Sequence, residues 1–392
     1  MVKEKILITL KYSLSVIATL ALLFFVLLFS VFNPTISLLI AIIFILALSF
    51  LTYKKKIHIK NFLIVFSISF LILSFPYIVA FSQSISLAKH ERNYPECFKG
   101  VRFNTLTHYF LYLFDFPLTL TNLKKLNVNS VYLVVFYKAN ENGKISEIPL
   151  SKFLAKLQVR RFHNLGYSVA LVPALLKPEN SISYGSLPEK ILEKENFWKN
   201  LENVILDTAK LAEKEKVELF FVLNEPEVVL GLHSENLTEE KCLKMMKFAK
   251  EILPKVKEVF KGKIGWHAAL GGNLVYWNEE KNKHELKCSL NLFNFSGYDY
   301  YGSTIIVTSD NIEKERKLAE DLVKIQLKIC NQSNSSLIFP ETFWKSKRQI
   351  EFFEFYFNES KERLKGSFIT LAAFGRNEII RTIEKLYGKF SC

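Results

Sequence analysis

The feature that most constrains the fold of this chain is a regular alternation of apolar and charged segments over residues 84–392. Apolar runs of strand length are followed by longer segments whose apolar residues recur at helical spacing. Eight runs have strand character, and they begin near Gly100, Ser130, Tyr167, Val217, Lys263, Phe295, Ser336 and Gly366. Helical patterns cover residues 150–164, 197–216, 238–260, 312–330 and 349–364. Eight such β/α units in about 250–300 residues predict an α/β fold, a (β/α)8 TIM barrel.

The first 83 residues have a different composition. Three uncharged apolar segments follow one another at residues 12–32, 36–53 and 61–82. Each is long enough to cross the hydrocarbon core of a bilayer as a helix. A signal peptide has one shorter apolar region, and Pro76 in the third segment is tolerated in a membrane-spanning helix. We therefore expect a membrane anchor of three transmembrane helices at residues 1–83 and a separate barrel domain at residues 84–392.

Lysines around these segments predict their orientation. They lie at the N-terminus and in the second connection, with none in the first connection, and they are Lys3, Lys5, Lys54, Lys55, Lys56 and Lys60. Lys and Arg near membrane ends are retained in the cytoplasm. We therefore expect a multi-pass protein of the cell membrane, with a cytoplasmic N-terminus and an extracellular C-terminal domain.

Other features bear on this placement and on the class of partner. Five Asn-x-Ser/Thr patterns are compatible with glycosylation, at Asn236, Asn294, Asn331, Asn334 and Asn358. The five cysteines contain no Cys-x-x-Cys pair, so a zinc or thioredoxin-like site is not expected, and one disulfide of unreadable pairing is possible. The net charge of +14 includes the topological lysines, and no basic run is interleaved with aromatic residues. Nucleic acid is therefore not an expected partner.

Two glutamates stand where predicted strands end. Glu225 follows Asn224 and precedes Pro226 after the run that begins at Val217, and Glu341 ends the run that begins at Ser336. Active sites of (β/α)8 barrels form at the carboxyl ends of the strands, so both side chains should meet in one cleft. Glycosidases need such a pair: one acid protonates the leaving oxygen, and one carboxylate attacks or activates water.

These residues resemble the retaining clan A glycoside hydrolases, which are built on this barrel. In that clan the acid/base glutamate follows an asparagine at the end of strand four, as in Asn224-Glu225, and the nucleophile ends strand seven, as in Phe339-Pro340-Glu341. Strand six contributes a tyrosine, and the matching stretch here is residues 297–302. Three further runs are most similar to the β-mannanase-type family 113, and more loosely to families 5 and 53; they are residues 129–137, 165–169 and 212–220.

The resemblance implies a role for each residue. Glu225 is the acid/base, Glu341 the nucleophile, and Asn224 the residue that holds the sugar 2-hydroxyl. Tyr301, with Tyr300 beside it, is expected to hydrogen-bond Glu341 and help keep it ionised. Glu225 must be protonated near neutral pH, and partial burial or the charge of Glu341 would raise its pKa accordingly.

The substrate contacts are less defined. Aromatic residues at or just beyond predicted strand ends are expected to stack on a poly- or oligosaccharide, and His267 to reach the cleft; the aromatic candidates are Phe136, Tyr137, Trp266, Tyr300 and Trp344. Two departures from the family patterns concern sugar contacts. Pro173 is followed by Ala174 instead of histidine, and strand two lacks the arginine that family 5 enzymes place near the nucleophile.

Several residues have plainer interpretations. Glu227 is expected to be a solvated loop residue, and Asp299 a structural one. No spacing indicates a metal, and no glycine-rich loop follows a strand, so neither metal nor cofactor is expected. The leading hypothesis is a membrane-anchored retaining glycosidase or transglycosidase. The alternative is a catalytically silent barrel that binds glycans or organises the envelope, because one fold hosts many functions.

Overall fold

The computed structural model describes residues 90–102, 123, 126–176, 186–233, 237–270, 274–289, 295, 297–304, 312–342, 360, 363–370, 384 and 387–388. The three predicted transmembrane segments, and with them the 1–83 anchor, lie outside these residues. Among the helices within them, none is both long and apolar enough to span a membrane.

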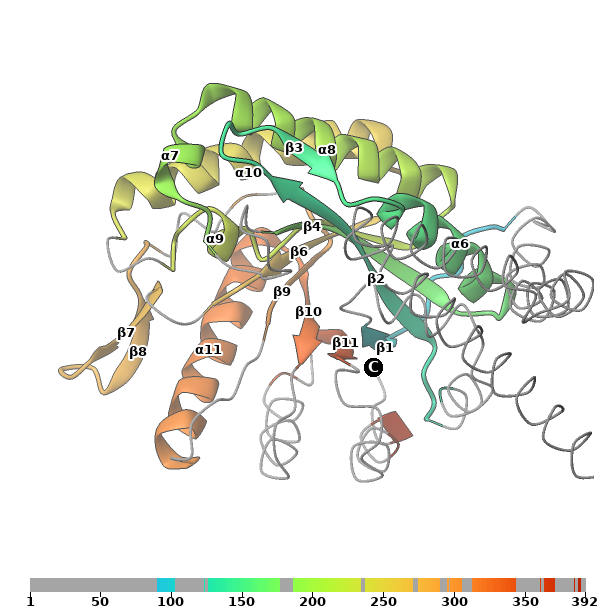
Figure 1. Cartoon of the computed structure of the whole chain (residues 1–392). Helices are drawn as coiled ribbons and strands as arrows, with labels where there is room; N and C mark the ends of the chain where they lie inside the picture. Colours follow the sequence, from blue (N-terminus) through green and yellow to red (C-terminus); the bar gives the residue numbers. More distant parts are fainter. Residues whose placement is uncertain are drawn as a thin grey trace, which may run out of the picture. The chain divides into compact units, whose positions relative to one another are not determined.

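Eight parallel strands form the core of the domain (Figure 1). In chain order they are β1 (Phe98–Arg102), β2 (Ser130–Ala139), β4 (Ser168–Leu176), β5 (Leu219–Asn224), β6 (Lys263–Ala268), β9 (Tyr300–Ser303), β10 (Ser336–Thr342) and β11 (Leu364–Thr370). Each pairs with the next in this order, and β1 also pairs with β11, which closes the sheet. The predicted TIM barrel is confirmed. The strands are nearly continuous apolar runs because both of their faces are buried.

Helices cover the outside of the strands (Figure 1). The long ones are α6 (Ser151–Asn164), α8 (Glu195–Lys214), α10 (Glu239–Val259) and α11 (Ile312–Ser333), and the short ones are α7 (Glu189–Leu192) and α9 (Pro226–Val229). In α8 the buried residues Phe197, Leu201 and Ile205 recur every four positions, which gives one apolar stripe against the barrel. Four predicted helices are therefore confirmed, and most of the fifth, at residues 349–364, lies outside the described part of the chain.

Three strands were not expected. Strand β3 (Ile145–Glu147) pairs antiparallel with the end of β2. Strands β7 (Val275–Asn278) and β8 (Lys283–Leu286) form a hairpin between β6 and β9, and this hairpin stands beside α11 (Figure 1). None of its eight residues is fully buried, so it carries no apolar run. The sixth barrel strand begins at Tyr300, five residues after the predicted start at Phe295.

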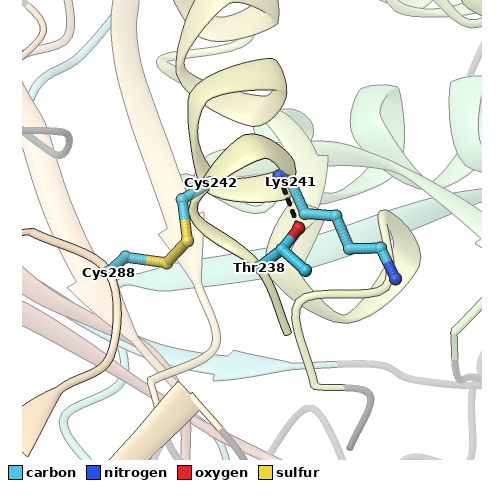
Figure 2. Close-up of a disulfide and its surroundings, with 4 residues drawn as sticks. All are labelled: Thr238, Lys241, Cys242 and Cys288. Carbon is cyan, nitrogen blue, oxygen red and sulfur yellow. Dashed lines mark hydrogen bonds between the residues drawn. A yellow bond between two sulfur atoms is a disulfide. The ribbon is translucent and has the colours of Figure 1, made fainter. Parts of the chain in front are cut away.

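A disulfide joins the base of this hairpin to α10. Cys242, in the first turn of α10, is bonded to Cys288, two residues after β8 (Figure 2). The helix begins at the cap residue Thr238, whose side chain accepts a hydrogen bond from the backbone N–H of Lys241 (Figure 2). Cys97 is also disulfide-bonded, whereas Cys330 is free and buried.

The amino ends of the strands are closed by the segment before β1. Glu218, immediately before β5, is fully buried and accepts hydrogen bonds from Nε2 of His90 and Nε2 of His163, both at 3.0 Å. The backbone N–H groups of Asn93 and Val169 bind the same carboxylate. These hydrogen bonds satisfy the buried Glu218 carboxylate, so this end of the barrel has a structural role. A functional site is expected at the opposite end, where the strands have their carboxyl ends.

Candidate active site at the carboxyl ends of the strands

The two predicted glutamates meet inside the barrel. Glu225 follows β5 directly and takes a left-handed conformation (φ 48°) at the start of α9, where Pro226 fits the first helical position. Glu341 lies near the end of β10 and is 4% exposed. One ligand atom each of Glu225, Glu341 and His267 lie within 4.8 Å of one another. The turn after Glu225 thus aims its carboxyl at Glu341 instead of along the strand.

Arg102, the last residue of β1, links the predicted site residues. Its Nη1 lies 2.6 Å from Oε2 of Glu341, and its Nη2 donates to Oδ1 of Asn224 at 2.7 Å. The guanidinium is 1% exposed, so this ion pair is almost fully removed from water. Arg102 was not predicted, because the family 5 pattern places its arginine on strand two. The available signal was weak, because β1 has the sequence Phe-Lys-Gly-Val-Arg and is not an apolar run.

A chain of hydrogen bonds supports Glu225 from the other side. The hydroxyl of Thr304, just beyond β9, donates a hydrogen bond to Oε1 of Glu225. Oγ1 of Thr304 also lies 2.8 Å from Nε2 of His267, and Nδ1 of His267 lies 2.8 Å from the hydroxyl of Tyr132. All three supporting side chains are buried. Thr304 carries no charge and Tyr132 sits in the middle of an apolar run, so nothing in the sequence marked them.

The two carboxyls have different electrostatic surroundings. Burial, and next the charge of Glu341, raise the pKa of Glu225 to about 7. Glu341 instead faces the guanidinium of Arg102. Burial, together with the positive charge of Arg102, lowers the pKa of His267 well below its ordinary value, so this imidazole is neutral. At neutral pH the site therefore combines a carboxylic acid that readily gives up its proton with a paired carboxylate.

Two groups in the described part of the chain have donors spaced for a metal ion: Glu225 with His267 and Glu341, and His90 with His163 and Glu218. In the first group the Arg102 guanidinium already supplies the positive charge, and both nitrogens of His267 are hydrogen-bonded. In the second, the imidazole rings stack with centroids 3.7 Å apart and planes 14° from parallel. Stacked rings direct their in-plane lone pairs side by side and not at one ion. Neither arrangement favours a metal.

Tyr301 and Tyr300 do not occupy the expected positions. Tyr301 pairs with Trp266 in the sheet, whereas Gly302 pairs with His267. Since side chains alternate across a strand, Tyr301 points to the side opposite His267 and the glutamates. Its buried hydroxyl has no hydrogen-bond partner among the described residues. The expected bond from Tyr301 to Glu341 is therefore wrong. Tyr300 begins β9 and packs edge-on against Phe98, the first residue of β1, so it lies at the opposite end of the barrel.

The other aromatic candidates do not offer their faces to a sugar. Phe136 is 1% exposed, and Tyr137 turns outward to α8, where its hydroxyl lies 2.8 Å from Oγ1 of Thr208. Trp266 is buried outside the strands. The expectations for Tyr137 and Trp266 are wrong because alternate side chains of a strand point outward, away from the barrel interior. His267 does lie at the site, as part of its hydrogen-bonded support. Trp344 lies outside the described residues.

Glu227 is not the solvated loop residue that was expected. It is fully buried, and its carboxyl accepts hydrogen bonds from Nε1 of Trp266 at 3.1 Å and the backbone N–H of Ala269 at 2.9 Å. Burial raises its pKa to about 7. Glu227 thus fastens α9, and with it the turn at Glu225, to β6. Asp299 is structural, as expected, because it accepts from the backbone N–H of Ile264 and lies 3.0 Å from Nζ of Lys263.

Comparison with known proteins bears on the fold. Neither family models nor curated proteins match the chain. A solved glycoside hydrolase family 113 β-1,4-mannanase matches with a TM-score of 0.52 and 13% identity over 76% of this chain and 100% of that one. The chain has the (β/α)8 fold of the clan A glycoside hydrolases.

Two other solved β-mannanases agree with this glycoside hydrolase fold. The endo-β-1,4-mannanase of Thermotoga petrophila gives a TM-score of 0.52 with 11% identity, covering 78% of this chain and 79% of that one. The endo-1,4-β-mannanase of Rhizomucor miehei gives 0.51 with 8% identity, covering 78% and 99%. Identities this low establish the fold alone, and the chemistry has to be argued from the side chains at the strand ends.

Proposed function

We propose that this protein is a retaining glycoside hydrolase, or a transglycosidase, that acts on β-linked glycans. Glu225 is the acid/base and Glu341 the nucleophile. The observation that carries the proposal is a pair of carboxyls with atoms within 4.8 Å of each other, one with its pKa raised to about 7 and the other beside a buried guanidinium. Retaining enzymes separate their carboxyls by about 5–5.5 Å, whereas inverting enzymes need roughly 6.5–9.5 Å to admit a water.

In the first step a Glu341 oxygen attacks the anomeric carbon while the bond from that carbon to the leaving oxygen breaks. Glu225 gives its proton to the leaving oxygen, which departs as an alcohol. The Arg102 guanidinium, 2.6 Å from Oε2, fixes the orientation of the Glu341 carboxylate. A nucleophile held this way loses little orientational freedom at the moment of attack.

In the second step Glu225, now ionised, takes a proton from water or from a sugar hydroxyl acceptor. The resulting oxygen attacks the anomeric carbon and releases the Glu341 carboxylate. Once the charge of Glu341 is masked in the covalent intermediate, the pKa of Glu225 falls, which suits its change from acid to base. Asn224 takes part through its amide: because Oδ1 accepts from Arg102, its NH2 group is the donor left for the sugar 2-hydroxyl.

We further propose that the domain works outside the cell, held to the membrane by residues 1–83. The uncharged segments and the flanking lysines support this placement. The Cys242–Cys288 disulfide adds support, since disulfides persist in oxidising compartments. A silent barrel would have no need for a guanidinium at the nucleophile, and Arg102 supplies from β1 the one that strand two lacks.

The test uses the full-length protein in detergent with a panel of aryl β-glycosides and β-linked oligosaccharides. Glu225→Gln and Glu341→Gln are compared with the parent, and Glu258→Gln, on the exposed side of α10, is the matched control. We expect turnover by the parent and the control, and losses of several orders of magnitude in both site variants. Absence of turnover across the panel, with glycan binding unchanged in both site variants, would favour the silent barrel.

A further inference from the structure

The hydrogen bonds around Thr304 run in one direction. The Thr304 hydroxyl has one proton and donates it to Oε1 of Glu225, so Oγ1 is an acceptor toward His267. Nε2 of His267 therefore carries the ring proton and donates it to Oγ1 of Thr304 at 2.8 Å. In the neutral imidazole Nδ1 is then the acceptor, and it takes the hydroxyl proton of Tyr132 at 2.8 Å. Nη1 of Arg102 lies 3.3 Å from Nδ1 and 3.5 Å from Nε2 of the same ring.

The backbone holds Thr304 in place independently of this chain of bonds. Its N–H donates to the carbonyl of Ala268 at 3.0 Å, and its own carbonyl accepts from the Ser303 hydroxyl at 3.1 Å. Thr304 is 6% exposed, so the hydroxyl has little freedom to turn to water. The donor that Glu225 receives is therefore fixed before any substrate arrives.

We propose that Thr304, oriented by His267 and Tyr132, is a positioning residue that reserves Oε1 of Glu225 as an acceptor and so confines the acid proton to Oε2. This inference rests on the proposed role of Glu225 as acid/base. It identifies Oε2 of Glu225 as the atom that donates the proton. The positions of the two carboxyls alone do not identify this atom. Thr304 also gives the ionised form of Glu225 a hydrogen bond, which prepares it to act as base in the second step.

Two substitutions separate the hydroxyl from the shape of the side chain. Thr304→Val removes the hydroxyl with little change in volume, and Thr304→Ser keeps it. Losing a hydrogen bond to the ionised form raises the pKa of an acid, so we expect Thr304→Val to move the alkaline limb of the kcat/KM profile upward by about one pH unit. Thr304→Ser should keep the parent profile.

The leaving group gives a second readout. For aryl glycosides with poor leaving groups, which need the acid, we expect kcat to fall about tenfold or more in Thr304→Val. For a 2,4-dinitrophenyl glycoside, whose leaving group needs no proton, the first step should be unaffected. Equal losses on both substrates with an unmoved pH limb, in a protein of unchanged unfolding temperature, would overturn the proposal. If Thr304→Val does not fold, Thr304→Ala takes its place in the same comparison.

A titration without substrate keeps this test distinct from the test of the proposed function. Infrared difference spectra follow protonation of Glu225, with Glu225→Gln identifying its carboxyl band. An upward pKa in Thr304→Val and a parental pKa in Thr304→Ser would support the positioning role even for a barrel with no turnover. A Glu225 pKa unchanged in Thr304→Val would overturn it even in an active enzyme.

Discussion

Replacing Glu341 by Gln should lower the pKa of Glu225, because the change removes a negative charge without altering the shape of the side chain. Two unit charges 4.8 Å apart interact by about 3.5 kcal/mol at an effective dielectric constant of about 20, which corresponds to about 2.5 pH units. Burial is the larger cause of the rise in the pKa of Glu225, and it remains in the variant, as does the opposing positive charge of Arg102. We therefore expect the pKa to fall from about 7 by roughly 2 pH units.

The measurement is an infrared difference titration of the carboxyl band that Glu225→Gln removes, in the parent and in Glu341→Gln. Glu258→Gln removes one charge from an exposed position on α10 and should leave the pKa of Glu225 at its parental value. The kcat/KM profile cannot replace this titration, since Glu341→Gln should be inactive. An unchanged pKa in Glu341→Gln would refute the reasoning, because it would mean that the two carboxyls do not share one site.

Three further predictions concern stability. Arg102→Met leaves Glu341 buried without its cation, so the free energy of unfolding should fall by about 3 kcal/mol in chemical denaturation, and a loss below about 1 kcal/mol would count against a buried ion pair. Because its folded pKa is raised to about 7, Glu227 contributes stability that is present below the ordinary pKa of 4.5 and lost as the pH rises through 7. The unfolding temperature of Glu227→Gln should then fall less between pH 5 and pH 8 than that of the parent, and equal slopes would contradict the assignment. The Cys242–Cys288 bond closes a loop with a sequence separation of 46, so replacing both cysteines by serine should cost roughly 2–4 kcal/mol, and insensitivity of the parent to reductant in thermal unfolding would argue against the bond.

The barrel strands were predictable because strands buried on both faces are short, nearly continuous apolar runs. The β7–β8 hairpin was not, since its exposed faces leave no such run and its position depends on contacts with α11, such as the bond from His284 to Asp321. The predicted start of the sixth strand, at Phe295, was too early for a local reason. Residues near Phe295 are aromatic and buried, yet Gly297 has a φ of 123°, which breaks the extended conformation before Tyr300.

The candidate site also contains both residues that could be predicted from the sequence and residues that could not. Glu225 and Glu341 were found because carboxylates that end apolar runs are uncommon and parallel strands bring their ends together. The prediction for Tyr301 was wrong because a shift of one residue along a strand moves a side chain to the other face of the sheet. Thr304 could not be found, since its role depends on the neutral form of His267, and that form is fixed by burial and by Arg102. Hydrogen bonds between distant strands leave no periodic mark in a sequence.

The most direct test of the central claim is trapping of the covalent intermediate. The full-length protein is incubated with a 2-deoxy-2-fluoro β-glycoside that has a good leaving group, chosen to match the sugar that the panel identifies, and the digested protein is examined by mass spectrometry. A retaining mechanism predicts one sugar adduct on the peptide that holds Glu341, formed slowly or not at all in Glu341→Gln. An adduct on another residue, or turnover of the parent substrate with inversion at the anomeric carbon, would contradict the assignment of Glu341 as nucleophile.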